Sequence, residues 1–206
     1  MQLSNRKILI AGGGSGMGLA LARLCVEAGA EVVIAGRGED RLRQARKALG
    51  NPAGLHIAVV DITREDQVAV LFAGIGGLDH IVSTAADIEG AYRLLPELDL
   101  KAAQHVVDSK LFGPLLLAKH GASLPATGSM SFVSGIAAYR PAPRGSVVAA
   151  VNAALEGLVR ALAIELAPIR VNAVSPGWVD TGIWAQVAGD RKAEMLAAMA
   201  ERLPVG

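Results

Sequence analysis

The chain has 206 residues, of which 52% are hydrophobic and only 3% aromatic, and its formal net charge at pH 7 is +1. The length fits one domain spanning residues 1–206, with a core built mainly from aliphatic residues and alanine. The small net charge and the shortage of aromatic residues argue against a nucleic-acid surface.

The sequence gives little sign of a targeting segment, a disulfide or a metal site. No apolar run reaches membrane-spanning length without a charged or amide residue inside it, so we expect a cytoplasmic protein without a membrane partner. Arg6 and Lys7 precede an apolar run as in a secretory signal, but its glycines would break the helix that a signal needs. The single cysteine, Cys25, excludes an internal disulfide, and the four histidines lack the spacing of metal ligands.

The first predicted strand, Lys7–Ala11, leads through a glycine-rich turn into a predicted helix at Gly16–Ala28. Glycine lets backbone N–H groups approach a pyrophosphate, and the N-terminus of the helix favours its negative charge. This arrangement predicts a dinucleotide-binding turn, the alternative being a flexible loop rich in small residues. The candidate cofactor contacts in the turn are Gly12, Ser15, Gly16, Met17 and Gly18.

Strand-length apolar runs alternate with helix-length amphipathic segments along the rest of the chain. This alternation predicts an α/β fold with a Rossmann-type doubly wound parallel sheet, strand order 3-2-1-4-5-6, and helices on both faces. The further predicted strands are Glu31–Ala35, His56–Val60, His80–Ser83, Ser129–Val133 and Arg170–Val174. The further predicted helices are Glu39–Leu49, Arg64–Ile75, Asp99–His120 and Ser146–Leu166.

The residues that follow the second and third predicted strands bear on the choice of cofactor. NAD-binding sheets place an acidic residue about 20 positions beyond the glycine turn, where it binds the ribose 2′-hydroxyl. Here Gly36 and Arg37 occupy that place, and because a guanidinium binds phosphate well they favour NADP(H) over NAD(H). The alternative is an arginine that only flanks a turn. Asp61, followed by Ile62, would bind the adenine amino group or cap the next helix.

These segments resemble the short-chain dehydrogenase/reductase family over nearly the whole chain. The resemblance rests on the glycine turn, on Asp61, on Leu78–Ala86 and on the run R-V-N-A-V-S-P-G-W-V-D-T at Arg170–Thr181. It departs at Ser83–Ala86, where the family has N-N-A-G. The resemblance implies a nicotinamide site at Ala85, Pro176, Gly177, Val179 and Thr181.

The catalytic positions depart further from the family pattern, which has a serine after the fifth strand and a tyrosine and lysine one turn apart on the next helix. The alignment puts Gly135 at the serine, Val148 at the tyrosine and Asn152 at the lysine. The family's helical asparagine aligns with Lys110. Valine cannot protonate an alkoxide, so the usual acid catalyst is missing.

Three residues are candidates to replace the missing groups: Lys110, Ser134 and Tyr139. Lys110 would face the nicotinamide pocket and stabilise or protonate an oxyanion; the alternative is a packed aliphatic stem with a solvated head. Ser134 precedes the serine position, and Tyr139 lies in the loop over the mouth of the pocket. Arg140 and Arg144 share that loop with Tyr139, where they would bind an acidic or polar substrate; the favoured alternative is that exposed arginine in a connecting loop needs no special reason.

Two functions fit this pattern. The favoured one is an NADP(H)-dependent oxidoreductase that acts on a small carbonyl or alcohol with a non-standard proton donor. The alternative is a catalytically inactive dinucleotide-binding protein that serves as a sensor, scaffold or partner subunit.

Two expectations concern assembly and the end of the chain. The apolar circumference of Val147–Leu166, together with Asp99–His120, predicts a homodimer or homotetramer, the alternative being a deeply buried helix in an alanine-rich core. Arg202–Gly206 resembles the point at which family members continue into a further helix and a seventh strand. We therefore expect the seventh strand to be missing, or the sequence to stop short of it.

Overall fold

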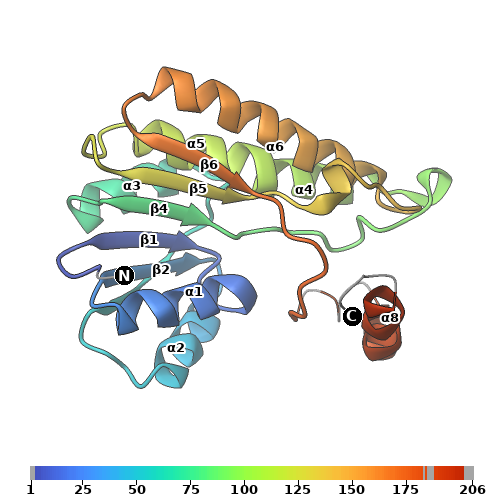
Figure 1. Cartoon of the computed structure of the whole chain (residues 1–206), viewed down its shortest axis with the longest axis horizontal. Helices are drawn as coiled ribbons and strands as arrows, with labels where there is room; N and C mark the ends of the chain where they lie inside the picture. Colours follow the sequence, from blue (N-terminus) through green and yellow to red (C-terminus); the bar gives the residue numbers. More distant parts are fainter. Residues whose placement is uncertain (1–2, 183, 185–187, 202–206) are drawn as a thin grey trace.

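A six-stranded parallel sheet forms the centre of the computed structural model, which describes residues 3–182, 184 and 188–201 (Figure 1). Its strand order is β3-β2-β1-β4-β5-β6, which confirms the predicted topology. The winding reverses between β1 and β4, and ligands of such sheets bind there, beyond the carboxyl ends of the strands. The strands are β1 (Lys7–Ala11), β2 (Glu31–Gly36), β3 (Leu55–Val59), β4 (His80–Ser83), β5 (Ser129–Val133) and β6 (Arg170–Val174).

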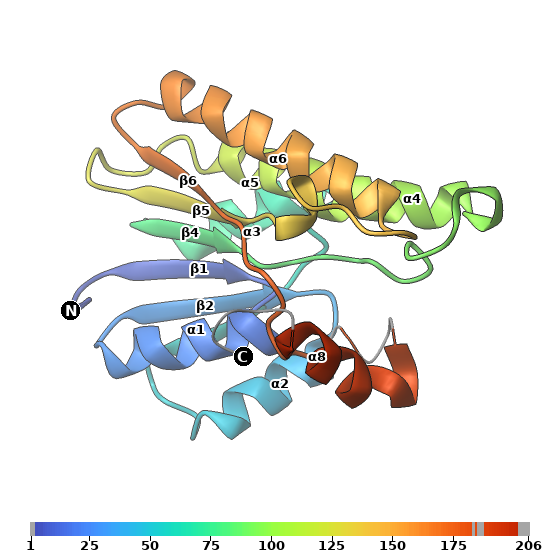
Figure 2. The same ribbon diagram turned by 45° about the vertical axis from the view of Figure 1, so that its right-hand side comes forward.

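Helices cover both faces of the sheet, as Figure 2 shows. Two helices, α1 (Gly16–Glu27) and α2 (Glu39–Ala48), enclose one apolar core with β1, β2 and β3. The other face carries a larger core, covered by α3 (Glu65–Ile75), α5 (Gly113–His120) and α6 (Ser146–Glu165). Two further α-helices are α4 (Leu100–Val107) and α8 (Lys192–Ala200), and the latter was not predicted. The short helical turns are η1 (Leu95–Glu97), η2 (Asp108–Phe112), η3 (Ile136–Ala138) and η4 (Gly189–Arg191).

The predicted continuous helix at Asp99–His120 is wrong in one respect, because it is interrupted by the π-helical turn η2 between α4 and α5. Pro114 explains the interruption. It has no N–H to bond the carbonyl of Lys110, four residues earlier, and its ring would press on that carbonyl. The helix therefore widens at Lys110. Such π-helical turns are frequent at functional sites.

The ends of the other helices follow the sequence signals closely. Gly29 and Gly50, both with positive φ, follow the C-terminal ends of α1 and α2, where glycine is the favoured residue. Asp99 caps α4 by accepting a hydrogen bond from the Lys101 backbone N–H at 3.0 Å. Asp66 and Ser146 lie in first turns rather than at caps.

Helix α6 is long and apolar enough, by length and composition alone, to span a membrane. Its composition has a second explanation, because Val151, Leu155, Val159 and Leu162 are all buried in this fold. The outer side of the helix includes the exposed Ile164, and assembly through α6 stays a prediction. Residues 202–206, on which the expectation about a seventh strand rests, lie outside the described part of the chain.

We predict opposite stability effects for two glycine-to-alanine substitutions. Gly18→Ala would bring Cβ to 2.3 Å from the Gly12 carbonyl oxygen, so we expect a loss of about 1–3 kcal/mol in the free energy of unfolding. Gly74, near the end of α3, has open space around it, and Gly74→Ala should gain about 0.5–1 kcal/mol. Urea denaturation tests both, and an unchanged midpoint for Gly18→Ala would contradict the close packing described here.

Candidate active site

The glycine turn after β1 is packed tightly between two other segments. The Thr84 hydroxyl, at the end of β4, lies 3.3 Å from the carbonyl oxygens of Ala11 and Gly12. A Cβ on Gly12 or Gly18 would collide with Thr84, whereas Gly16 has φ of +51° and lies beside Thr181. Only a residue without a side chain therefore fits at positions 12 and 18, and such positions let the backbone approach a pyrophosphate closely.

The N-terminus of α1 is suited to an anion. Ser15 stands at the N-cap position but makes no side-chain capping hydrogen bond, and the first turn holds no acidic residue. The positive end of the helix and its first N–H groups thus lack a neutralising side chain, which fits a bound phosphate. Met17, within the same turn, lines the cavity described below.

An ion pair crosses the sheet beside this turn. Arg37 follows β2 and Asp87 follows β4, and Arg37 Nη1 lies 2.9 Å from Asp87 Oδ2. Because β1 lies between β2 and β4, the pair spans the carboxyl end of β1. The Asp87 backbone N–H donates to Ser109 Oγ at 2.9 Å, which holds this end of the bridge in place.

Asp61 and Ile62 follow β3 in different environments. Asp61 Oδ1 accepts hydrogen bonds from the Thr63 backbone N–H at 3.0 Å and from the Thr63 hydroxyl at 2.8 Å. Asp61 therefore stabilises the turn before α3, and adenine binding stays a prediction. The Ile62 side chain is buried in the core, where it fills the space beside Gly113.

A cavity of about 170 Å³ lies beyond the carboxyl ends of β4, β5 and β6. Several predicted site residues line it together: Met17, Lys110, Ser134, Pro176, Gly177, Val179 and Thr181. Thr84, Ala86 and Val133 also line it, whereas Ala85 and the glycines of the turn do not. The cavity therefore joins the segment expected to contact nicotinamide to the positions expected to be catalytic.

Lys110 lies at this cavity with its side chain almost fully buried, at 7% exposure. Its Nζ lies 3.4 Å from the Val133 carbonyl oxygen and 3.3 Å from that of Ser134. Burial lowers the pKa of Lys110 to about 8, because the charged ammonium is poorly solvated. The alternative of a solvated head group is therefore wrong.

Asn152 lies at the same cavity and is 2% exposed. Its Oδ1 is buried and has no hydrogen-bond partner among the described residues. A Cβ on Gly135 would lie 2.8 Å from Asn152 Nδ2, so the amide occupies the space that a serine side chain at position 135 would need. Val148, at the tyrosine position, is buried in the cavity wall.

Lys110 and Asn152 together reverse the arrangement of the family pattern. The family pattern has an amide on the first helix and an ammonium on the second; this chain has Lys110 on the first and Asn152 on the second. Both side chains reach the turn that follows β5, at Ser134 and Gly135. The two polar groups are thus exchanged between helices while the ammonium stays beside the cavity.

Tyr139 is turned away from the cavity. Its hydroxyl donates to Glu156 Oε2, and this hydrogen bond raises the pKa of Tyr139. Ser134 Oγ donates to Glu156 Oε1 at 2.9 Å and lies 3.2 Å from the Asn152 carbonyl oxygen. Glu156, a buried carboxylate that no sequence motif points to, therefore holds the hydroxyls of both Ser134 and Tyr139.

Aromatic side chains form one wall of the cavity. The ring centroids of Trp178 and Trp184 lie 4.5 Å apart, and those of Tyr92 and Trp184 lie 6.4 Å apart. Trp184 Nε1 donates to the Val179 carbonyl oxygen at 2.8 Å, which fixes the indole beside the expected nicotinamide segment. The two tryptophans therefore form part of the cavity wall.

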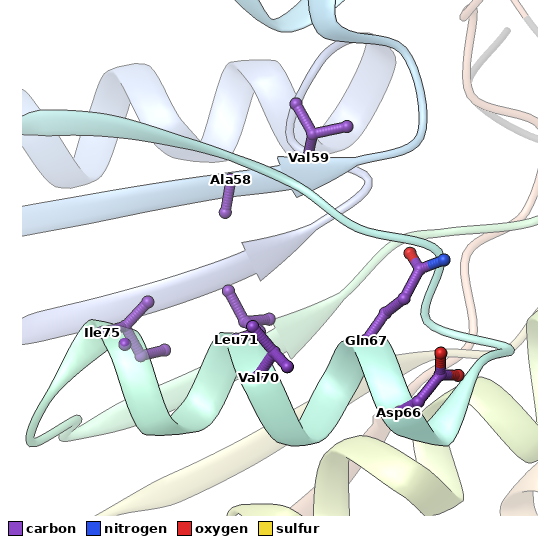
Figure 3. Close-up of a pocket in the computed structure, with 8 residues that line it drawn as sticks. Ala58, Val59, Asp66, Gln67, Val70, Leu71 and Ile75 are labelled. Atoms are coloured by element: carbon purple, nitrogen blue, oxygen red, sulfur yellow. The ribbon is translucent and has the colours of Figure 1, made fainter.

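A larger and shallower groove of about 470 Å³ lies elsewhere, between β3 and α3 (Figure 3). Its lining is mostly aliphatic, including the exposed Val59 and Val70, and Asp66 is its one ionisable side chain among the described residues. Since it lacks both the glycine turn and a cluster of polar groups, we place the candidate active site at the smaller cavity.

The doubly wound parallel sheet, with the glycine turn after β1 and helices on both faces, defines a Rossmann-type α/β fold. Residues 11–206 match the family described as enoyl-(acyl carrier protein) reductase. The short-chain dehydrogenase/reductase ucsE of an Acremonium species is 34% identical over 98% of this chain and 83% of its own length. The chain belongs to the short-chain dehydrogenase/reductase family, whose relatives here are oxidoreductases.

Two further proteins extend the comparison. The cis-4-hydroxycyclohexanecarboxylate dehydrogenase of Sinomonas cyclohexanicum is 36% identical over 98% of this chain and 83% of its own length. A variant of actinorhodin polyketide ketoreductase, solved with NADPH, superposes with a TM-score of 0.88 at 26% identity. That likeness covers 100% of this chain and 85% of the ketoreductase.

We predict that Lys110 destabilises the folded protein in a pH-dependent way. Its pKa is lower in the folded than in the unfolded chain, so unfolding takes up a proton between about pH 8 and 10.5 and stability rises with pH across that window. Below pH 8 the full penalty, about 3 kcal/mol, opposes folding. Lys110→Met should therefore be more stable than wild type at pH 7, and the gap should narrow by pH 10.

Calorimetric unfolding at pH 7 and pH 10 measures this gap. Lys101→Met is the matched control, because Lys101 lies exposed on α4. If the stability difference between Lys110→Met and wild type does not change with pH, the titration of a buried Lys110 is contradicted.

Proposed function

We propose that the chain is an NADP(H)-dependent oxidoreductase that interconverts a small carbonyl compound and its alcohol, with Lys110 as the proton donor and acceptor. The observation that carries this proposal is the buried ammonium of Lys110 at the cavity that Pro176, Gly177, Val179 and Thr181 also line. The name of the Sinomonas relative, which refers to a hydroxycyclohexanecarboxylate, is consistent with a small cyclic substrate.

The chemistry divides between the cofactor and the chain. The bound nicotinamide supplies or takes the hydride. Lys110, mostly protonated at pH 7, stabilises the developing alkoxide by its charge and then gives it a proton. The resulting neutral amine suits a buried site, because desolvation penalises only the charged form. Asn152 Oδ1, which lacks a partner among the described residues, can accept a hydrogen bond from the alcohol hydroxyl.

A specific observation supports the second candidate, a cofactor-binding protein without turnover. Val148 stands at the tyrosine position, and the hydroxyl of Tyr139 is held by Glu156 outside the cavity. If Lys110 does not transfer protons, no other described side chain at the cavity combines burial with a pKa near neutrality. The two candidates therefore differ in the role of Lys110.

The preference for NADP(H) depends on Arg37, which follows β2 and is exposed. A 2′-phosphate beside β2 would compete with Asp87 for the guanidinium. The ion pair is a modest obstacle, since exposed pairs contribute about 0.2–1 kcal/mol. Arg37 therefore supports phosphate binding once it is released from Asp87.

We predict that NADPH binds more tightly than NADH and that Arg37→Asp reverses the order, because a carboxylate repels the phosphate but accepts a hydrogen bond from the ribose hydroxyl.

Asp87→Asn should tighten NADPH binding by up to about fivefold, because it frees Arg37. Titration calorimetry measures the dissociation constants of these protein–cofactor pairs. Asp79→Asn is the control: Asp79 also pairs with an arginine and is also 20% exposed, but it lies at the opposite edge of the sheet. Weaker NADPH binding by Asp87→Asn would contradict the competition.

We predict that Lys110→Met lowers the rate of hydride transfer by about 10²- to 10⁴-fold, the usual loss when an acid catalyst is removed. Single-turnover oxidation of NADPH with a panel of cyclic ketones measures the rate, and Lys101→Met is the control. Wild-type activity should fall as the pH rises through about 8.

A reciprocal variant separates proton donation from a structural role. Lys110→Asn combined with Asn152→Lys restores one ammonium to the cavity, so it should be more active than Lys110→Asn alone. Turnover that survives Lys110→Met refutes the proposed donor, and absence of turnover with every ketone favours the cofactor-binding candidate.

A further inference from the structure

The charges at the cavity have one sign. Among its described lining residues only Lys110 and Arg140 carry a formal charge, and no aspartate or glutamate is present. The carboxylate of Glu156, which is not part of the lining, accepts hydrogen bonds from Ser134 and Tyr139. The cavity therefore favours an anionic ligand over a neutral or cationic one.

Arg140 is held at the mouth of the cavity by its backbone. Its N–H donates to the Ile136 carbonyl oxygen at 2.9 Å, where the chain leaves η3. Its guanidinium makes no ion pair or hydrogen bond with the described side chains, in contrast to Arg37, which pairs with Asp87. Arg140 is thus available to bind a carboxylate with two parallel hydrogen bonds.

The walls of the cavity are suited to a ring. Tyr92, Trp178 and Trp184 form an aromatic side, while Ile88, Ile136 and Val148 form an aliphatic side. Such walls bind a flat or puckered ring, and they contribute no charge that would repel an anion.

We propose that the substrate is a cyclic ketone, or the corresponding secondary alcohol, and that it carries a carboxylate that Arg140 binds. The proposal rests on the proposed function for the direction of the chemistry. In reduction, the carbonyl carbon gains a hydride from the reduced nicotinamide and the oxygen gains a proton from Lys110. The products are a secondary alcohol and the oxidised cofactor, and the carboxylate is unchanged. Lys110 thus acts on the reacting oxygen, and Arg140 determines specificity at the other end of the ligand.

Intrinsic fluorescence offers a binding measurement that does not depend on turnover. The chain has only two tryptophans, Trp178 and Trp184, and both line the cavity. We would titrate the protein, saturated with NADP⁺, with 4-oxocyclohexanecarboxylate and separately with its methyl ester. A ketone cannot react with the oxidised cofactor, so quenching reports occupancy alone. We expect the carboxylate to bind at least about tenfold more tightly than the ester, as a charge-assisted hydrogen bond provides.

Two arginine variants decide whether Arg140 causes this preference. Arg140→Gln should abolish it, whereas Arg144→Gln, in the same loop but outside the cavity lining, should retain it. Equal binding of acid and ester by wild type, or a preference that survives Arg140→Gln, overturns the proposal. Unfolding temperatures of both variants establish that the loop changes leave the fold intact.

Turnover is measured separately, by oxidation of NADPH with the same ketone acid. An Arg140-dependent preference without turnover contradicts the proposed function and leaves the carboxylate site standing. Turnover without the preference supports the proposed function and overturns the carboxylate site.

Discussion

The close approach of α1 to the end of β1 is the contact on which the site depends. Gly12 and Gly18 bring two stretches of backbone to a separation that no side chain permits, and Thr84 ties the same turn to β4. Parallel strands place all their carboxyl ends at one edge, so this contact also sets the distance from the turn to the segments after β5 and β6. A looser turn would move the cofactor end of the site away from the cavity.

The second constraint is a buried ammonium. Desolvation opposes the charged form of Lys110, and two backbone carbonyls at the end of β5 offset part of that effect. Pro114 interrupts the helical hydrogen bonds at Lys110, so the widened turn and the unusual side chain coincide. Natural proteins retain such destabilising arrangements mainly where function requires them.

The exchange of ammonium and amide between two helices explains how the site departs from the family pattern without losing its charge. Asn152 fits because Gly135 has no side chain, and Val148 closes the wall where a tyrosine would have stood. Glu156 then holds Ser134 and Tyr139 to one side of the cavity. The cavity thus has one buried cation and an amide oxygen without a hydrogen-bond partner among the described residues.

The sequence by itself determined the fold, because the alternation of strands and helices and the glycine turn depend on local periodicity and on backbone conformation that neighbouring residues dictate. It also predicted the strand order and most element boundaries, and it singled out the segment that is expected to contact nicotinamide. Only the tertiary structure decided which candidate side chains meet: it buried the head of Lys110, turned Tyr139 to Glu156 and joined Arg37 to Asp87. These contacts link residues far apart in the chain, and their energies depend on burial and on partners from other elements, which no local pattern encodes.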